Sequence, residues 1–242
     1  MREVRIYEPG DYAPDQEFEL SAAAGQHVGV VLRMQAGEKI TLFRGDNYEF
    51  EAAIVSVHKR KVTVAILNQR LVNRESPRSI HLAQVISKGE RMEIVIQKAV
   101  ELGVSRITPL ISERSVVKLN EERMGKKLTQ WQAIAIAACE QCGRNQVPEI
   151  EPILYVNDYL QHPLSALKFV LHPDMGKRWR DYQFSADELT VLIGPEGGFS
   201  TKEIRQILAF NFNPLSLGPR ILRTETAAIA ALSVLQAICG DL

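Results

Sequence analysis

VLIGPEGGFS at residues 191–200 and LSLGPRILRTET at residues 215–226 are the two segments that decide the fold of this 242-residue chain. Each begins as an apolar strand, reaches a Gly-Pro pair and leads into a helix. Two strand–turn–helix connections close together predict an α/β domain with a parallel sheet. Open sheets of this class bind ligands beyond the carboxyl ends of their strands, so both turns are predicted to line a binding site.

The first turn is suited to close contact with a ligand. Pro195 fixes φ and lacks an N–H group, while Gly197-Gly198 allow the backbone to approach a ligand and to take positive φ. Ser200 with Glu203 three residues later predicts a capping box for the next helix. The turn lacks the lysine of a phosphate loop and carries Glu196, so we expect a cationic or neutral ligand. An ordinary tight connection in an α/β domain is the alternative.

The second turn carries two arginines and a helix start. Arg220 and Arg223 flank two apolar residues, and Thr224-Glu225-Thr226 is predicted to supply N-cap hydroxyls and an acid. The helix expected over residues 227–238 is apolar nearly all the way round, so it must be covered on more than one side. Its own domain and a second copy of the chain are the two covers available, which predicts a homodimer.

Three upstream segments complete a family resemblance: KGERM at 88–92, EQCGR at 140–144 and LHP at 171–173. Together with the two turns, they resemble the RsmE family of SPOUT methyltransferases over essentially the whole chain. That family uses S-adenosylmethionine to methylate N3 of one uridine in 16S ribosomal RNA. The resemblance implies the same activity here. The expected partner is 16S RNA in the assembled 30S subunit, and the sequence leaves naked RNA open as the alternative substrate.

The resemblance also implies a domain arrangement. Residues 1–72 would form a small PUA-like β-barrel that binds RNA. Residues 73–242 would form the α/β methyltransferase domain, a SPOUT-type parallel sheet with a C-terminal trefoil knot. Such a knot is a rare exception to the usual rules of chain connection. The family further implies a homodimer whose active sites lie at the subunit interface.

Hydrophobic patterning indicates that the chain changes near residue 72 from closely spaced strands to alternating strands and helices. Closely spaced strands that suggest a small barrel are expected at residues 4–7, 27–32, 39–43, 49–57 and 61–67. After a polar linker at residues 73–78, strands and helices alternate. The later strands are expected at 80–86, 106–111, 169–171, 190–193 and 215–217, and the helices at 90–102 and 121–142.

By resemblance, the cofactor lies against the loops of the knot and is held mainly by main-chain groups, while side chains exclude water. The implied cofactor-binding residues are Leu171, His172, Ile193, Gly194, Pro195, Glu196, Gly198, Leu217, Gly218, Ile221, Leu222, Thr224, Thr226 and Ala227. His172 could equally be a strand-edge residue without a ligand contact.

The chemistry requires orientation and charge stabilisation. A sulfonium methyl group is already activated, so no metal is expected, and the protein must hold the methyl carbon in line with N3. Loss of the N3 proton spreads negative charge over the uracil carbonyls, which an arginine could stabilise as an oxyanion hole does. Arg223 is the predicted catalytic residue, followed by Arg220 and then by Arg91 and Arg144.

Contacts to the RNA are expected from local basic clusters. The predicted RNA-binding residues are Arg2, Arg5, Lys59, Arg60, Lys88, Arg91 and Arg144. Because 29 Lys and Arg balance 29 Asp and Glu, non-specific RNA affinity should be modest. The basic run at residues 58–61 has a simpler alternative as a solvated hairpin turn. The family's N-terminal Arg-x-Phe is matched only in part, by Arg5-Ile6-Tyr7 or by Arg2-Glu3-Val4. The target base must be unpaired or flipped out to reach the pocket.

Composition and sequence motifs argue against several other classes of protein. No run approaches the length of a membrane helix, and the start of the chain does not read as a signal peptide, so a cytoplasmic protein without a membrane partner is expected. The Cys139 and Cys142 pair has too few companions for zinc and is expected in the core. Ser200 caps a helix and does not sit in a hydrolase nucleophile turn.

Two other functions stay open. A SPOUT methyltransferase that modifies ribose 2′-O or another base would be separated by product analysis of the methylated RNA. A non-catalytic RNA-binding factor that keeps the fold would be separated by calorimetry, because it should not bind S-adenosylmethionine.

Overall fold

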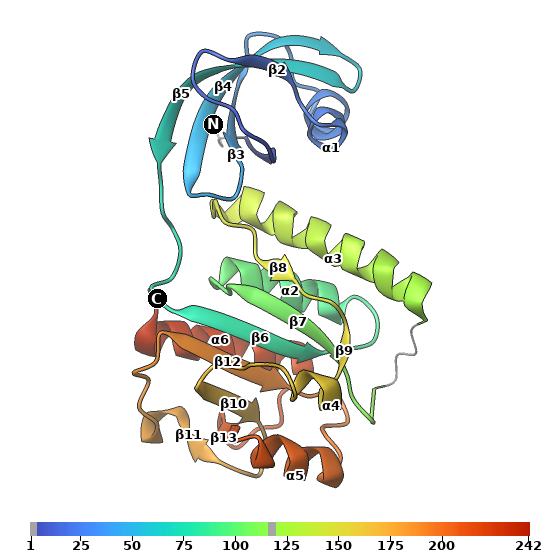
Figure 1. Ribbon diagram of the computed structural model, residues 1–242, viewed down its shortest axis with the longest axis vertical. Helices are drawn as coiled ribbons and strands as arrows, with labels where there is room; N and C mark the ends of the chain where they lie inside the picture. The colour runs from blue at the N-terminus through green and yellow to red at the C-terminus, as the bar shows by residue number, and fades with distance from the viewer. Residues whose placement is uncertain (1–3, 116–119) are drawn as a thin grey trace. The chain divides into compact units, whose positions relative to one another are not determined.

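The computed structural model describes residues 4–115 and 120–242 (Figure 1). The chain forms two compact units. Unit 1 comprises Met1–Glu75 and Cys139–Val147, and unit 2 comprises Ser76–Ala138 and Pro148–Leu242. The predicted division at residue 72 falls close to the first of these junctions, and the domain assignment built on it stays a prediction. Each unit is described by itself below.

Unit 1 contains a five-stranded sheet in the order β1-β3-β4-β5-β2. Its elements are β1 (Arg5–Tyr7), β2 (Glu17–Glu19), α1 (Ala22–Gln26), a π-helix (His27–Val31), β3 (Lys39–Phe43), β4 (Tyr48–His58) and β5 (Lys61–Leu71). Strand β1 runs parallel to β3, and the other pairs are antiparallel. Its core is a cluster of aliphatic and aromatic side chains that includes Leu42, Phe50 and Val64. The strands expected at 39–43, 49–57 and 61–67 are confirmed.

The strand predicted over residues 27–32 is wrong, because α1 continues there as a π-helix. Gly25 and Gly29 face the β4–β5 turn so closely that an added Cβ would lie 2.1 and 2.2 Å from two of its carbonyl oxygens. Val28 is fully buried by this packing. Tertiary contact therefore outweighs the β-propensity of the valines in this segment.

Unit 2 is an α/β layer structure around one parallel sheet in the order β11-β13-β10-β12-β6-β7-β8, with β9 paired to β7. Its strands are β6 (Ser79–Val85), β7 (Arg106–Ile111), β8 (Glu149–Ile150), β9 (Leu154–Tyr155), β10 (Leu167–Leu171), β11 (Lys177–Arg178), β12 (Glu188–Ile193) and β13 (Asn213–Ser216). Its helices are α2 (Arg91–Glu101), α3 (Glu121–Cys142), whose last turn belongs to unit 1, α4 (Val156–Tyr159), α5 (Thr201–Ala209) and α6 (Thr224–Cys239), with a 3-10 turn at Trp179–Asp181.

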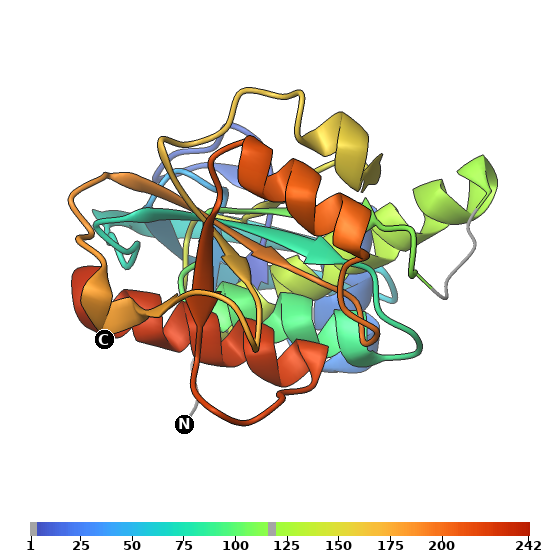
Figure 2. The same cartoon turned by 90° about the horizontal axis from the view of Figure 1, so that it is seen from below.

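Helices cover both faces of this sheet. Figure 2 shows α2 and α6 side by side on one face and α4 and α5 on the other, in agreement with their packing contacts. The central strands are buried on both faces, and Leu82, Phe169 and Val191 are fully inaccessible to solvent. Parallel strands covered in this way have near-continuous apolar sequences, which is why the sequence predicted them well. The predicted helix at 121–142 is confirmed at both ends.

Of the two predicted helix starts, that of α5 is confirmed and that of α6 is wrong in its cap. The capping box is confirmed, since the Glu203 N–H donates to Ser200 Oγ at 3.1 Å and the Ser200 N–H donates to Glu203 Oε2 at 2.9 Å. The expected hydroxyl cap of the last helix is wrong. Arg223 is the N-cap residue of α6, and Thr224 is already inside the helix. Its hydroxyl is used elsewhere, because it donates to the Gly194 carbonyl.

Of the two cysteines predicted in the core, Cys139 is buried, whereas Cys142 is only partly buried. Burial raises the pKa of the Cys139 thiol to about 12. The residues that the structure describes contain no cluster of side chains able to hold a metal ion. Across the same residues, no helix combines the length and apolarity needed to cross a bilayer. The predicted knot stays a prediction.

Candidate functional site

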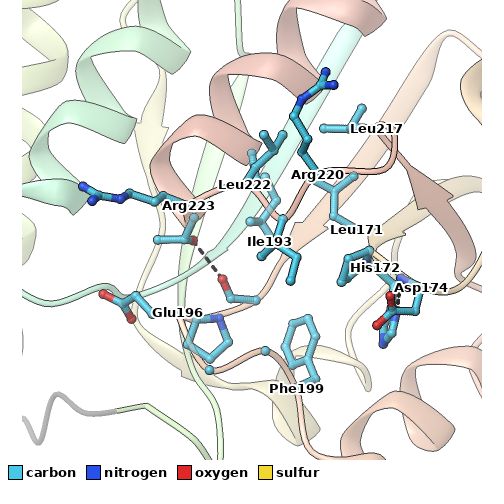
Figure 3. A pocket seen from close by; sticks show the side chains of 18 of the residues that line it. Leu171, His172, Asp174, Ile193, Glu196, Phe199, Leu217, Arg220, Leu222 and Arg223 are labelled. Carbon is cyan, nitrogen blue, oxygen red and sulfur yellow. Dashed lines mark hydrogen bonds between the residues drawn. The ribbon is translucent and has the colours of Figure 1, made fainter.

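A pocket of about 650 Å³ opens where the two Gly-Pro turns meet (Figure 3). It lies beyond the carboxyl ends of β10, β12 and β13, which contribute Leu171, Ile193 and Leu215. The parallel sheet aligns these strand ends at one edge, so turns far apart in sequence become neighbours. The pocket is therefore where an open α/β sheet is expected to bind its ligand.

The predicted cofactor residues converge on this pocket. Every one of them lines it except Thr226, which is exposed on α6. Arg220, Arg223 and Arg91 line it as well. The other lining residues were not among the predicted cofactor-binding or catalytic residues, and they are Arg114, Pro173, Asp174, Gly197, Phe199 and Leu215. Pro173, Gly197, Phe199 and Leu215 lie within the motifs, whereas Arg114 comes from the loop after β7 and had no local signal.

The first turn is shaped by its glycines. Gly198 has a φ of +65° and closes the turn by donating its N–H to the Pro195 carbonyl at 2.9 Å. Gly194 lies against the ring of Phe199, where an added Cβ would be 3.0 Å from the nearest ring atom. In the second turn, Gly218 has a φ of +124°. Side chains at these positions would strain the backbone or narrow the pocket.

A chain of hydrogen bonds links the two turns beneath the pocket. The fully buried Gln84, at the end of β6, donates through Nε2 to Thr224 Oγ1 at 3.0 Å. The Thr224 hydroxyl then donates to the Gly194 carbonyl at 2.9 Å, as the dashed line in Figure 3 shows. The start of α6 is therefore tied to the first turn and to the central strand β6. We call these three residues the Gln84 relay.

Glu196 is paired with Arg91. The Arg91 Nη1 lies 2.7 Å from Glu196 Oε1, and the Lys88 N–H also donates to this oxygen at 3.2 Å. Burial opposes ionisation of Glu196, but the backbone donors and Arg91 outweigh it, so the pKa of this carboxyl lies below its ordinary value. The turn therefore presents an ionised carboxylate at neutral pH, which agrees with the expected preference for a cationic or neutral ligand.

Arg220 and Arg223 are both exposed and extend from the second turn in different directions (Figure 3). Glu196 lies on the side of the pocket toward which Arg223 extends. Within residues 4–115 and 120–242, neither guanidinium forms an ion pair. Both are therefore free to meet an anion at the pocket mouth. Nearby, the His172 Nδ1 accepts the Asp174 N–H at 3.2 Å.

The predicted RNA contacts divide into exposed and buried residues. Lys59 and Arg60 are exposed at the β4–β5 turn, and Lys88 is exposed beside the pocket. Arg5 is only 8% exposed and lies 2.5 Å from Glu49, which is itself buried. Burial would raise the pKa of Glu49, but Arg74 and Arg5 outweigh it and lower this pKa to about 2.

Arg144 is also buried, and it pairs with Glu75 within unit 1. For Arg5 and Arg144 the structure thus favours a structural role over the predicted contact with RNA. The same burial removes Arg144 from the catalytic candidates. Arg2 lies outside the described residues.

Comparison with known proteins gives matches along almost the whole chain. The family model described as an RNA methyltransferase domain matches residues 74–236. A second one, described as an RNA methyltransferase PUA domain, matches residues 20–67. The curated relative named ribosomal RNA small subunit methyltransferase E from Buchnera aphidicola is 40% identical over 239 residues, which are 98% of this chain and 97% of the relative.

Solved structures agree with these matches. A ribosomal RNA small subunit methyltransferase E from Neisseria gonorrhoeae, bound to S-adenosylmethionine, is 37% identical, with a TM-score of 0.93 and full coverage of both chains. A methyltransferase from Legionella pneumophila with the same bound cofactor is 59% identical, with a TM-score of 0.98 and full coverage of both chains. The fold expected from the sequence, a parallel α/β sheet preceded by a PUA-like domain, is confirmed.

Proposed function

Since this chain belongs to the ribosomal RNA small subunit methyltransferase E family, we propose that it methylates N3 of one uridine in 16S ribosomal RNA with S-adenosylmethionine as methyl donor. The observation that carries the proposal is the pocket itself. Both Gly-Pro turns meet at one site together with Arg220 and Arg223, neither of which forms an ion pair within the described residues.

The pocket fits the proposed cofactor. Its volume of about 650 Å³ suits a nucleoside-sized ligand. Ile193, Leu217 and Leu222 supply apolar walls, while the main-chain groups of both turns are available as donors and acceptors. The ionised Glu196, which is paired with Arg91, places a carboxylate in the pocket wall that a cation can approach. When bound, the cofactor supplies an electrophilic methyl group attached to a sulfonium.

The residues of the chain have separate tasks in this proposal. The two turns hold the methyl donor in one orientation. The hydrogen bonds of the Gln84 relay hold the two turns in fixed positions relative to each other. A uracil that enters the pocket must lose its N3 proton, and the resulting charge spreads over its carbonyl oxygens. Arg223, exposed and without an ion pair among the described residues, stabilises that charge. Arg220 is placed to bind a neighbouring phosphate.

Product analysis on the natural substrate tests the proposal. Purified 30S subunits from cells that lack this activity are incubated with the protein and methyl-labelled S-adenosylmethionine. The labelled 16S RNA is then digested and the methylated nucleoside identified by mass spectrometry. We expect one methyl group at N3 of a single uridine. A label on ribose 2′-O or on another base, or no incorporation, would contradict it.

A further inference from the structure

The edge strand of the unit 2 sheet carries a basic and aromatic cluster that the proposed function has not used. It consists of Lys177, Arg178, Trp179 and Arg180, here called the basic edge. The three cationic side chains are exposed, and Trp179 is half-buried. Strand β11 lies at the end of the strand order, so one side of the cluster has no neighbouring strand within the described residues.

The basic edge is held firmly against β13. Gly176, just before it, approaches the neighbouring backbone so closely that an added Cβ would lie 2.2 Å from the Pro214 carbonyl oxygen. Tyr182, just after it, donates its hydroxyl to the same oxygen at 2.7 Å. The Tyr182 ring also packs edge-on against the buried Phe169 at 5.1 Å between centroids. The cluster is thus presented from a fixed backbone anchored on both sides.

The strand register places the basic edge beside the pocket. Lys177 pairs with Leu215 and Arg178 with Ser216, in parallel. Leu215 and Leu217 line the pocket, so β11 lies one strand spacing, about 4.8 Å, from its wall. Because β11 is parallel to the rest of the sheet, Trp179 and Arg180 follow its carboxyl end, at the edge where the pocket opens.

The charges of the basic edge are not neutralised by neighbouring acids. Asp187 is paired with Arg78, and Asp181 accepts the backbone N–H of Arg178 at 3.1 Å. The side chains of Lys177, Arg178 and Arg180 form no ion pair with any residue that the structure describes.

The Arg180 guanidinium lies over the Trp179 ring, 4.7 Å from its centroid. Cations on an edge strand also discourage edge-to-edge pairing, but that role requires no aromatic ring beside them.

We propose that the basic edge binds the single-stranded RNA next to the target nucleotide, with phosphates on Lys177 and Arg178 and a base stacked on Trp179 and Arg180. Exposed cations that follow a backbone, together with an aromatic face, are how proteins hold single strands without reading sequence. The inference rests on the proposed function, which requires an unpaired base and therefore single-stranded RNA flanking the pocket.

The phosphate contacts are tested with a matched pair of double variants. K177Q/R178Q removes one lysine and one arginine from the basic edge. R123Q/K126Q removes the same two residue types from the exposed start of α3. Binding to unmethylated 30S subunits is measured against salt concentration. We expect K177Q/R178Q to bind at least tenfold more weakly at low salt. The slope of log affinity against log salt concentration should become shallower by about 1.4, because two phosphate contacts to a single strand are lost. R123Q/K126Q should match the wild type.

Stacking is tested at Trp179. We expect W179A to weaken 30S binding roughly tenfold and W179F to weaken it less than threefold. Affinity for S-adenosylmethionine, measured by calorimetry, should stay within twofold of wild type in all these variants, which excludes misfolding. Equal 30S binding by K177Q/R178Q and R123Q/K126Q, or equal binding by W179A and W179F, would overturn the proposal. Binding does not need methyl transfer, so a wild type that binds without methylating would count against the proposed function alone.

Discussion

At the scale of single residues, Arg223 combines a fixed backbone with an unrestrained side chain. It is the N-cap residue of α6, yet its side chain makes no capping hydrogen bond. Removing the guanidinium should therefore leave the helix start intact. Arg223 differs in this respect from Arg5 and Arg144, whose side chains are buried in ion pairs that stabilise the fold.

We expect Arg223→Ala to lower the methylation rate about 100- to 1,000-fold while changing cofactor affinity less than threefold, because charge stabilisation acts in the transition state. Single-turnover rates with saturating 30S subunits and calorimetry with S-adenosylmethionine measure the two effects. Arg220→Ala is the control, and it should mainly weaken RNA binding. An unchanged rate in Arg223→Ala would remove this residue from the mechanism.

His81 couples the stability of unit 2 to pH. It is buried, and its Nε2 lies 2.6 Å from Thr108 Oγ1 and 3.7 Å from Glu151 Oε2. Burial and the nearby Arg106 outweigh Glu151 and lower the pKa of His81 to about 4. The unfolded chain takes up this proton near pH 6.5, so unfolded molecules bind more protons between the two values. Stability is therefore complete above pH 6.5 and falls as the pH is lowered.

We expect the free energy of unfolding to drop by about 2 kcal/mol between pH 7 and pH 5 through His81. Urea unfolding at the two pH values measures the drop. His81→Gln cannot take up the proton and should lose most of this difference, even though it is less stable at pH 7. If the variant and the wild type lose equal stability on acidification, His81 does not carry the effect.

At the scale of secondary-structure elements, the sequence patterns predicted an element correctly where the local conformational preference of the residues agrees with their tertiary contacts. The buried strands β6, β7 and β12 have apolar runs that admit one interpretation, and the capping box fixed the start of α5. The prediction for residues 27–31 was wrong because their conformation depends on Gly25 and Gly29, which pack against a hairpin turn 30 to 35 positions away. The short strands β8, β9 and β11 have too few residues for a recognisable period.

The Gln84 relay makes the start of α6 part of the cofactor site. Thr224→Val keeps the shape of the side chain but leaves the Gly194 carbonyl and Gln84 Nε2 without this partner. Since an unsatisfied buried group costs about 1–3 kcal/mol, we expect roughly tenfold weaker binding of S-adenosylmethionine by calorimetry. Thr224→Ser retains the hydroxyl and should bind within threefold of wild type. Equal affinities for the two variants would mean that the relay does not order the turns.

At the scale of the whole molecule, the site could be predicted because its two main segments each carry a complete motif. The sheet then brings those motifs to one edge. Arg114 and Asp174 could not be found in this way, since nothing in their own segments marks them. The burial of Arg5 and Arg144 could not be predicted for a related reason. Their partners lie far away in sequence, as Arg5 and Glu49 do, and composition cannot distinguish a paired arginine from a free one.

The predicted homodimer belongs to this scale. Helix α6 packs one face on α2 and β12, while Ala230, Val234 and Ala237 on its other face are apolar and only partly covered or exposed. At the pocket mouth, Ile221 is 86% exposed. An apolar helix face of this kind favours a second copy of the chain as its cover.

We expect the wild type to be a dimer by light scattering and Val234→Arg to shift it to the mass of one chain, because a buried unpaired charge would oppose the interface. Val55→Arg is the matched control. It places the same charge at an exposed valine on β4, outside α6, and should leave the dimer intact. If both variants keep the dimer mass, α6 does not form the interface. If the wild type has the mass of one chain at micromolar concentration, the apolar face of α6 needs another explanation.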